Sequence, residues 1–448
     1  MTSFRELENY ISRTSIKAAR ADLDATARFQ PMVEAYLGQE TREIMADRAP
    51  FSTGLKYLAL LEGSVAAHQR LFETVDRGVA PALGAVASIQ VSRRLGEYLA
   101  APIYLEKLYF AYGESPYIGQ FLAESYAAAG NIHSLESFSI GVARTNSKVS
   151  RATNQDLSRW VNLLADFGLT NTARLFLPHI TDAGLTTFLE NRLATFERHE
   201  EFNFPLRSIN LESEDRKWRI TSSAFEKAGY TNFHRHLAVP GTSLPTGVRT
   251  ALVPQPDIQN LLGVGAFACW LSHWKVWETV AEDSSFPFGI ILEDDALPFT
   301  GPSYLRRLLP ELSGFDIVWI NRRMSGIAHT DNPEWKTGLL DPWEQLSSWP
   351  AGRQGWGADG YLLTRRGAEK LLLMTESVGI MNHVDGQLGA VSTTASSEPS
   401  NAIQEIIVDM KKSMSQAKQL HSTALQIPAV RERPFGLSST VTIDREIK

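Results

Sequence analysis

Three consecutive carboxylates, Glu293, Asp294 and Asp295, directly follow the apolar run 288–292. We name these residues the acidic trio. Burying unpaired carboxylates is costly, so the acidic trio must reach solvent, pair with basic groups or hold a cation. Oxygen ligands suit Mg²⁺ or Mn²⁺, which in turn bind diphosphate oxygens. Because ligands of open α/β sheets bind outside the carboxyl ends of strands, the trio predicts a metal-bound nucleotide site. A solvated acidic turn is the alternative.

The elements around the acidic trio alternate between strands and helices. We expect strands at 206–211, 287–293, 315–320 and 358–363, and helices at 214–229, 264–282, 302–311, 365–376 and 401–420. This order predicts an α/β domain with a largely parallel sheet over residues 203–448.

Residues 1–202 contain little strand-like alternation and are predicted to form an all-helical domain. Residues 122–130 and 160–168 share apolar positions and a closing glycine at an offset of 38 residues. This pattern resembles degenerate tetratricopeptide hairpins. A plain helical bundle is the alternative.

Composition excludes several classes of protein. The net charge of −6 and the absence of a Lys/Arg run argue against a nucleic-acid partner. The single cysteine, Cys269, excludes an intramolecular disulfide and a multi-cysteine metal cage. The acidic start does not look like a signal peptide, and we expect no transmembrane segment. The expected location is cytoplasmic, with any membrane contact peripheral at the inner membrane.

Several segments, in order, resemble glycosyltransferase family 25, which contains bacterial lipooligosaccharide galactosyltransferases and procollagen galactosyltransferases. They are Ile209-Asn210-Leu211 with Asp215-Arg216, then Ala238-Val239-Pro240-Gly241, Gly265 to His273, Ile291 to Ala296, Gly360-Tyr361 with Gly367-Ala368, and Val384-Asp385. The resemblance covers about residues 204 to 440. Ala268 and the segment 239–241 depart from the family pattern.

The resemblance implies a GT-A type fold, a UDP-sugar donor, a divalent cation (Mn²⁺ or Mg²⁺) and inversion at the anomeric carbon. It implies transfer of a hexose, galactose or glucose, to a saccharide or protein-linked acceptor, as in lipopolysaccharide biosynthesis. Asp295 is then the main metal ligand, with Glu293 beside it, while Glu293 or Asp294 touches the ribose or a metal-bound water. Asp385 is the expected catalytic base; a second metal contact and a helix N-cap are its alternatives.

Three further residues are expected in the donor site by the same resemblance: Asn210, Arg216 and His273. Their alternatives are, in the same order, a strand-end cap, a solvated helix residue and a hydrogen-bonded histidine at the edge of the core. Three others are held in reserve: His383 and His421 as further metal ligands, and Trp356 as a platform for a sugar ring.

The sequence leaves two rival functions open. One is a helical-repeat interaction protein with an inactive transferase-like module. The other is a nucleotide-dependent enzyme of another reaction type, such as a nucleotidyltransferase. In the leading interpretation, the helical domain recruits the acceptor or a protein partner.

Overall fold

The computed structural model describes residues 4–433 except 48, 97–98, 112–114, 146–148, 198–201, 245, 254–261, 329, 331–332, 348–356, 395–397 and 414–418. The chain divides into two compact units. The first unit ends at Trp160 and the second begins at Val161. The chain thus passes from one unit to the other inside a helix, before the change of sequence pattern at residues 202/203.

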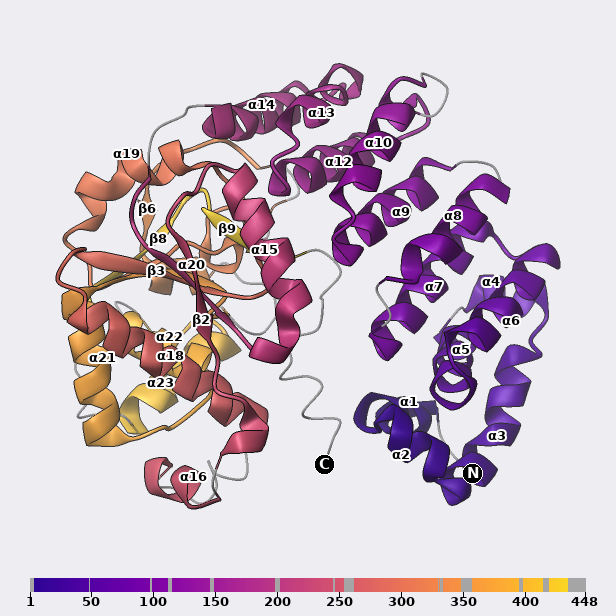
Figure 1. Ribbon diagram of the computed structural model, residues 1–448, viewed down its shortest axis with the longest axis horizontal. Coiled ribbons are helices and arrows are strands. Elements are labelled where there is room, and N and C mark those ends of the chain that lie inside the picture. The colour runs from indigo at the N-terminus through magenta and orange to yellow at the C-terminus, as the bar shows by residue number, and fades with distance from the viewer. Residues whose placement is uncertain are drawn as a thin grey trace. The chain divides into compact units, whose positions relative to one another are not determined.

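The first unit is helical throughout its described residues, as the sequence predicts (Figure 1). Its helices are α1 Phe4–Arg13, α2 Ile16–Ala21, α3 Leu23–Leu37, α4 Thr41–Ala46, α5 Ala49–Glu62, α6 Ser64–Asp76, α7 Pro81–Leu95, α8 Ala101–Ala111, α9 Pro116–Ala129, α10 Ile132–Ala143 and the start of α12, Asn154–Asp166.

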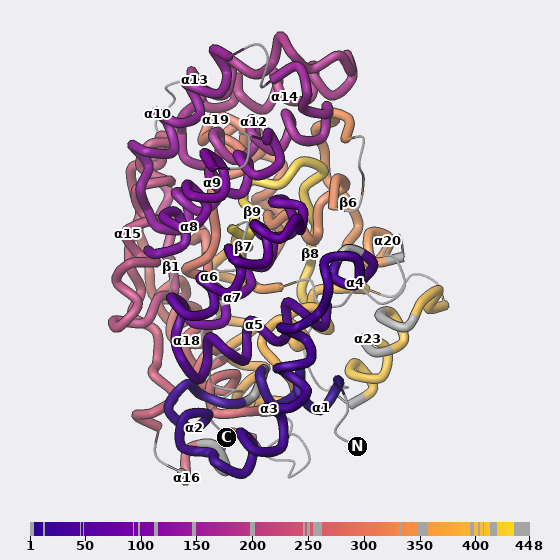
Figure 2. The backbone as a smooth tube through the Cα atoms, turned by 90° about the vertical axis from the view of Figure 1, so that its right-hand side faces the viewer, coloured from indigo at the N-terminus to yellow at the C-terminus, as the bar shows by residue number. Residues whose placement is uncertain are grey.

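Successive helices of the first unit follow one another in space, from α1 to α10 (Figure 2). Neighbours along the chain pack together, for example α5 with α6 and α8 with α9, and alternate helices such as α5 and α7 also meet. Helix α9 ends at Gly130, whose φ of 76° needs a glycine. This stacking is compatible with the expected hairpins, and the tetratricopeptide assignment stays a prediction.

The second unit combines helices with strands (Figure 1). Its helices are α13 Thr170–Arg174, α14 Ala183–Glu197, α15 Asp215–Lys227, α16 Thr246–Leu252, α18 Val264–Glu282, α19 Pro302–Leu312, α20 Pro342–Ser347, α21 Arg365–Val378, α22 Val384–Ser392 and α23 Ala402–Ser413. Its strands are β1 Leu206–Asn210, β2 Phe233–Leu237, β3 Phe288–Glu293, β4 Ala296–Pro298, β5 Ile317–Trp319, β6 Leu339–Leu340, β7 Gly360–Thr364, β8 Ser422–Leu425 and β9 Val430–Glu432.

Seven of these strands form one sheet in the order β2-β1-β3-β7-β5-β8-β6. Only three of the six pairings are parallel, because β7 runs antiparallel between β3 and β5, and β6 is antiparallel to β8. The expectation of a largely parallel sheet was therefore wrong: the sheet is mixed. Helices α18 and α21 pack side by side against it (Figure 1). The α/β character is confirmed.

Within the second unit, backbone contacts at Gly301 hold helix α14 against the start of α19. A Cβ at this position would collide with the carbonyl group of Thr195 in α14. The Gly301 N–H donates to Thr195 Oγ1 at 2.8 Å, and Ser303 Oγ donates to the Thr195 carbonyl at 2.9 Å. Glycine is required here because the two backbones approach so closely. Residues 183–197 therefore pack as part of the α/β unit.

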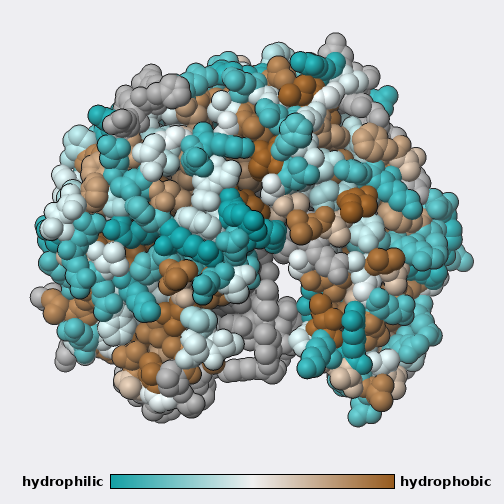
Figure 3. All heavy atoms as spheres, in the orientation of Figure 1, coloured by the Kyte–Doolittle hydropathy of each residue, from teal (hydrophilic) through white to brown (hydrophobic). Residues whose placement is uncertain are grey.

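Of the helices that the structure describes, none has the length and apolar character needed to cross a membrane. On the face shown in Figure 3, apolar side chains lie in patches among polar ones.

Candidate active site

One edge of the main sheet collects polar residues from several strands. Strands β1, β3, β5 and β8 run in one direction, so their carboxyl ends meet the amino end of antiparallel β7. Asn210 ends β1, the acidic trio ends β3, Asn321 follows β5, and Asp359 precedes β7. The topology therefore brings together side chains that lie far apart in the sequence.

Asp294 is the member of the acidic trio that holds the surrounding elements together. Its Oδ2 accepts from Asn210 Nδ2 at 2.8 Å, and its Oδ1 lies 4.0 Å from Lys217 Nζ. Its carbonyl accepts from Thr221 Oγ1 at 2.8 Å and from the Arg433 guanidinium. The carboxylate thus faces Asn210 on one oxygen and Lys217 on the other, and through these contacts Asp294 links the end of β3 to β1 and α15.

The Asn210 side chain is also hydrogen-bonded to groups of the protein. Its amide group donates to Asp294 Oδ2 and, at 3.2 Å, to the Glu214 carbonyl, while its Oδ1 accepts from Arg235 Nε at 2.8 Å. The side chain is 1% exposed. An amide group has two N–H donors, and both are used here. A direct contact between Asn210 and the UDP-sugar, as expected from the sequence, would have to replace one of these hydrogen bonds.

Glu293 faces the opposite way, toward α18. Its Oε1 lies 3.5 Å from Nε2 of His273, which is fully buried, whereas the Glu293 side chain is 28% exposed. Burial lowers the pKa of His273 to about 4, so the imidazole is neutral at pH 7. His273 therefore lies behind Glu293, and it is Glu293 that reaches solvent.

Asp295 is the member of the acidic trio with a buried carboxylate oxygen that has no hydrogen-bond partner. It is 7% exposed, and its Oδ1 is buried without a hydrogen-bond partner. Burial and then the negative charges of Glu293 and Glu432 raise its pKa well above the usual range. A buried carboxylate oxygen without a donor is suited to a cation, which would supply the missing positive charge.

Asp359 is a functional candidate that sequence reasoning missed. Its Oδ1 accepts from Asn321 Nδ2 at 2.9 Å, and its Oδ2 is buried without a hydrogen-bond partner. Burial raises its pKa to about 7, against the opposing effect of the Arg323 guanidinium. A signal existed: Asp359 directly precedes Gly360-Tyr361, so it enters the sheet at the edge where the acidic trio leaves.

The C-terminal strand β9 brings two more charged residues to this edge. It pairs antiparallel with β4, which places Ala296 opposite Glu432. The backbone N–H of Arg433 then donates to the Asp295 carbonyl at 2.8 Å, and Glu432 pairs with Arg323. No local pattern in the sequence marks Glu432 or Arg433, because a long-range pairing puts them there.

Two further residues expected in the site, Arg216 and Asp385, lie in the first turns of two different helices. Arg216 is half-buried in the first turn of α15, and its charge adds to the effect of burial in lowering the pKa of Arg433. Asp385 is half-buried in the first turn of α22, where His383 is the N-cap residue. The charge of Asp385 raises the pKa of Glu293, so the two carboxylates are close enough to interact. Because His383 is the N-cap residue of α22, the N-cap alternative for Asp385 is wrong.

Of the residues held in reserve, His421 does not join the site. His421 Nδ1 lies 3.0 Å from the Gly314 carbonyl, and its ring stacks on Phe315 at a centroid distance of 4.6 Å. This places His421 at the start of β8, at the opposite edge of the sheet. Trp356 lies outside the described residues.

We expect two carboxyl groups of the unliganded protein to titrate near pH 7. Burial and neighbouring negative charge raise the pKa of Glu293 and of Asp359 to about 7. Since the folded state holds these protons above the unfolded pKa, stability falls as pH rises from about 4.5 to about 7. Carboxyl ¹³C NMR measures both titrations.

The Glu293→Gln variant is the control for this titration. It should remove one transition and lower the pKa of Asp359, because it removes a negative charge that raises that pKa. Titration of both groups below about pH 5 would contradict this electrostatic description of the site.

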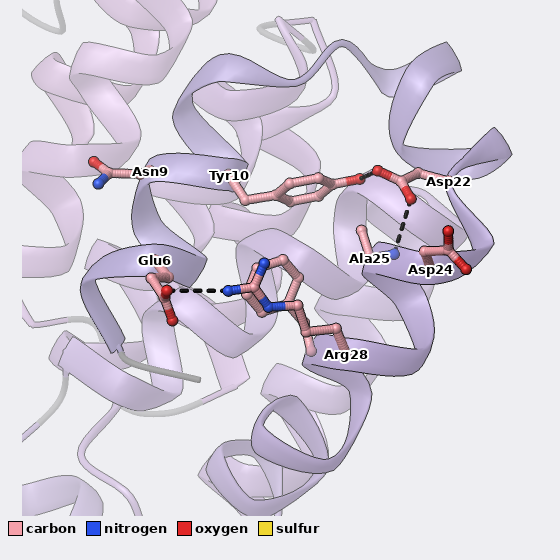
Figure 4. Close-up of a pocket in the computed structure, with 8 residues that line it drawn as sticks. Glu6, Asn9, Tyr10, Asp22, Asp24, Ala25 and Arg28 are labelled. Carbon is pink, nitrogen blue, oxygen red and sulfur yellow. Dashed lines mark hydrogen bonds and ion pairs between the residues drawn. The ribbon is translucent and has the colours of Figure 1, made fainter. Parts of the chain in front are cut away.

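A separate hollow of about 450 Å³ lies in the first unit, between α1 and α3 (Figure 4). Glu6 and Arg28 pair across it at 3.0 Å. Tyr10 Oη donates to Asp22 Oδ2 at 3.2 Å, and Asp22 caps α3 by accepting from the Ala25 N–H. These polar groups satisfy one another, so the hollow has a structural explanation.

Residues 208–301 match the family model described as Glycosyltransferase family 25 (LPS biosynthesis protein). The matched range includes Asn210, Arg216, His273 and the acidic trio, and it ends before Asp359 and Asp385. The match confirms the resemblance in the C-terminal half and supports glycosyltransferase activity in lipopolysaccharide biosynthesis. No curated protein matches the chain.

Proposed function

We propose that this protein is an inverting, metal-dependent glycosyltransferase that moves a hexose from a UDP-sugar to a saccharide or protein-linked acceptor. The family match supports sugar transfer. The single observation that carries the metal and nucleotide assignment is Asp295: a buried carboxylate oxygen without a hydrogen-bond partner, at the sheet edge where nucleotides bind. The GT-A type fold is part of this proposal.

The surrounding charges fit a divalent cation. Burial and neighbouring negative charges, among them Glu432, raise the pKa values of Glu293, Asp295 and Asp359 at this edge, so a cation relieves the repulsion between these carboxylates. Asp295 and Glu293 are the residues that would hold Mn²⁺ or Mg²⁺. When bound, the ion neutralises charge on the departing diphosphate.

The chain's own residues then have separate tasks. Asp294, clamped by Asn210 and Lys217, fixes the end of β3 so that Asp295 keeps its position. Arg433, at the carbonyl groups of Asp294 and Asp295, and Arg216, on α15, supply positive charge for phosphate oxygens. Asp385, half-buried and close to Glu293, is the proposed base that takes the acceptor hydroxyl proton.

Two rival functions predict different products. An inactive transferase-like module releases no nucleotide from any donor. A nucleotidyltransferase uses similar carboxylates and Mg²⁺ but releases pyrophosphate instead of UDP. In both rivals, the first unit would still be free to bind a partner.

The test is a panel of UDP- and GDP-sugars with Mn²⁺, assayed for UDP, GDP and pyrophosphate release in the presence of bacterial oligosaccharide acceptors. We expect UDP release from UDP-galactose or UDP-glucose that depends on the metal and on the acceptor. Release of pyrophosphate, or no release with any donor and acceptor, would contradict the proposed reaction.

A further inference from the structure

Among the residues that the structure describes, one group of three metal-binding side chains comes within reach of a single ion. It consists of Cys269, His273 and Glu293, which offer the Sγ, a ring nitrogen and a carboxylate oxygen within 4.8 Å of one another. Cys269 and His273 are four residues apart on α18, so they share one face of the helix. Glu293 meets them from the end of β3.

The orientation of His273 points to a ligand at Nε2. Its Nδ1 lies 2.9 Å from Tyr361 Oη, which also accepts from Trp277 Nε1 at 2.8 Å. Nε2 is fully buried and has no hydrogen-bond partner. In the tautomer that donates from Nδ1 to Tyr361, Nε2 presents a lone pair toward Glu293 and Cys269. Metal-binding histidines are usually oriented in this way through their other nitrogen.

The spacing fits a tetrahedral ion better than a hydrogen bond. Bonds of about 2.0–2.3 Å at tetrahedral angles place neighbouring ligand atoms roughly 3.3–3.7 Å apart. Nε2 and Oε1 are 3.5 Å apart and do not form a hydrogen bond. Cys269 Sγ lies within 4.8 Å of the ligand atoms that His273 and Glu293 offer. A small movement of the Cys269 side chain would complete three corners of a tetrahedron.

We propose that Cys269 Sγ, His273 Nε2 and the Glu293 carboxylate form a site for a thiolate-binding divalent ion of the zinc class. The sulfur ligand favours zinc over Mg²⁺ or Mn²⁺, which prefer oxygen. As the metal–sulfur bond forms, the thiol proton of Cys269 leaves to solvent. Cys269 is half-buried and the Glu293 side chain is 28% exposed, so the ion can enter and a water can take the fourth position.

The local charge favours such an ion. Burial is the main cause of the shifted pKa values of Cys269, Glu293 and His273, and the negative charge of Asp385 acts on all three: it adds to the raised pKa of Cys269 and Glu293 and opposes the lowered pKa of His273. Because Glu293 also belongs to the proposed nucleotide site, zinc bound here should inhibit sugar transfer, and Mn²⁺ should relieve the inhibition. That consequence rests on the proposed function, whereas binding of the ion does not.

Cobalt provides a direct test, since Co²⁺ bound to a thiolate absorbs strongly in the near ultraviolet by charge transfer. Cys269 is the only cysteine in the chain, so any such absorption reports this residue. Titration of the full-length protein with Co²⁺ should produce the band at one equivalent, and Zn²⁺ should abolish it. Cys269→Ser should remove the band, and His273→Gln should weaken Co²⁺ binding by more than about tenfold.

Asp295→Asn is the matched control, because it removes a neighbouring carboxylate that is not a proposed ligand of this ion. It should leave the cobalt band unchanged even if it abolishes sugar transfer. Absence of the band in the wild-type protein, or a band of equal affinity in folded His273→Gln, would overturn the proposal. The readout requires no enzymatic activity, so its failure is distinct from failure of the proposed function.

Discussion

The Asp295→Asn substitution is expected to lower the rate of sugar transfer by at least about a hundredfold, the scale observed when an electrostatic partner of a transition state is removed. Asp295 carries the buried Oδ1 without a hydrogen-bond partner, which we assign to the metal of the donor. An amide of the same size keeps the shape of the site but loses the negative charge that binds the ion. The measurement is UDP release at saturating donor and Mn²⁺.

Stability of the same variant separates a functional role from a structural one. Burial and neighbouring carboxylates raise the pKa of Asp295, so its charge opposes folding in the absence of metal. Asp295→Asn should therefore unfold at the same temperature as the wild-type protein or at a higher one. A variant that loses activity only because it melts early would assign Asp295 to the structure and not to the reaction.

Asp294→Asn is the matched control, since it makes the same charge change one residue away. The Asp294 carboxylate already faces Asn210 and Lys217. Its replacement should lower stability and reduce transfer less than Asp295→Asn does. Equal losses of activity in both variants, with unchanged stability, would show that the two carboxylates share the metal.

The Asp166→Ala substitution is expected to destabilise the second unit by about 3–5 kcal/mol, the usual cost of breaking a buried ion pair. Asp166 and Arg192 are both fully buried, and Arg192 Nη2 donates to Asp166 Oδ1 at 2.6 Å. Arg431 pairs with the other carboxylate oxygen. Removing the carboxylate leaves two guanidinium groups without their shared counter-ion. Urea unfolding followed by tryptophan fluorescence measures the effect.

An exposed ion pair in the same unit provides the comparison. Arg174 and Glu197 also form an ion pair, but their side chains are 37% and 47% exposed. Glu197→Gln should change the free energy of unfolding by less than about 1 kcal/mol, because solvent screens such pairs. A similar cost for the two substitutions would contradict the role of burial. Arg431 lies in β9, so loss of Asp166 should also disturb Glu432 and reduce activity.

Local patterns in the sequence were enough for strands β1, β3, β5 and β7, for several helices and for part of the site. The apolar run before Glu293 predicted β3, and the helix expected at 302–311 corresponds to α19. The position of the acidic trio at a strand end also followed from the local sequence. These features depend on periodicity and on the few residues next to each strand end, which act over short distances along the chain.

Only the tertiary structure decided which direction each carboxylate of the acidic trio faces and which partners it meets. Asp294 turns toward β1 and α15, Glu293 turns toward α18, and Asp295 is buried beside the Arg433 backbone. Nothing in the spacing of three adjacent carboxylates distinguishes these directions. Each one depends on partners that lie elsewhere in the chain.

The rest of the site came from pairings between distant segments. Antiparallel β7 makes the sheet mixed and delivers Asp359 to the functional edge, and the pairing of β4 with β9 delivers Glu432. The sequence by itself determined where strands end and which end carries the acidic chemistry. Only the fold decided which distant charges join it, because strand pairing is set by packing over the whole sheet and not by any local pattern.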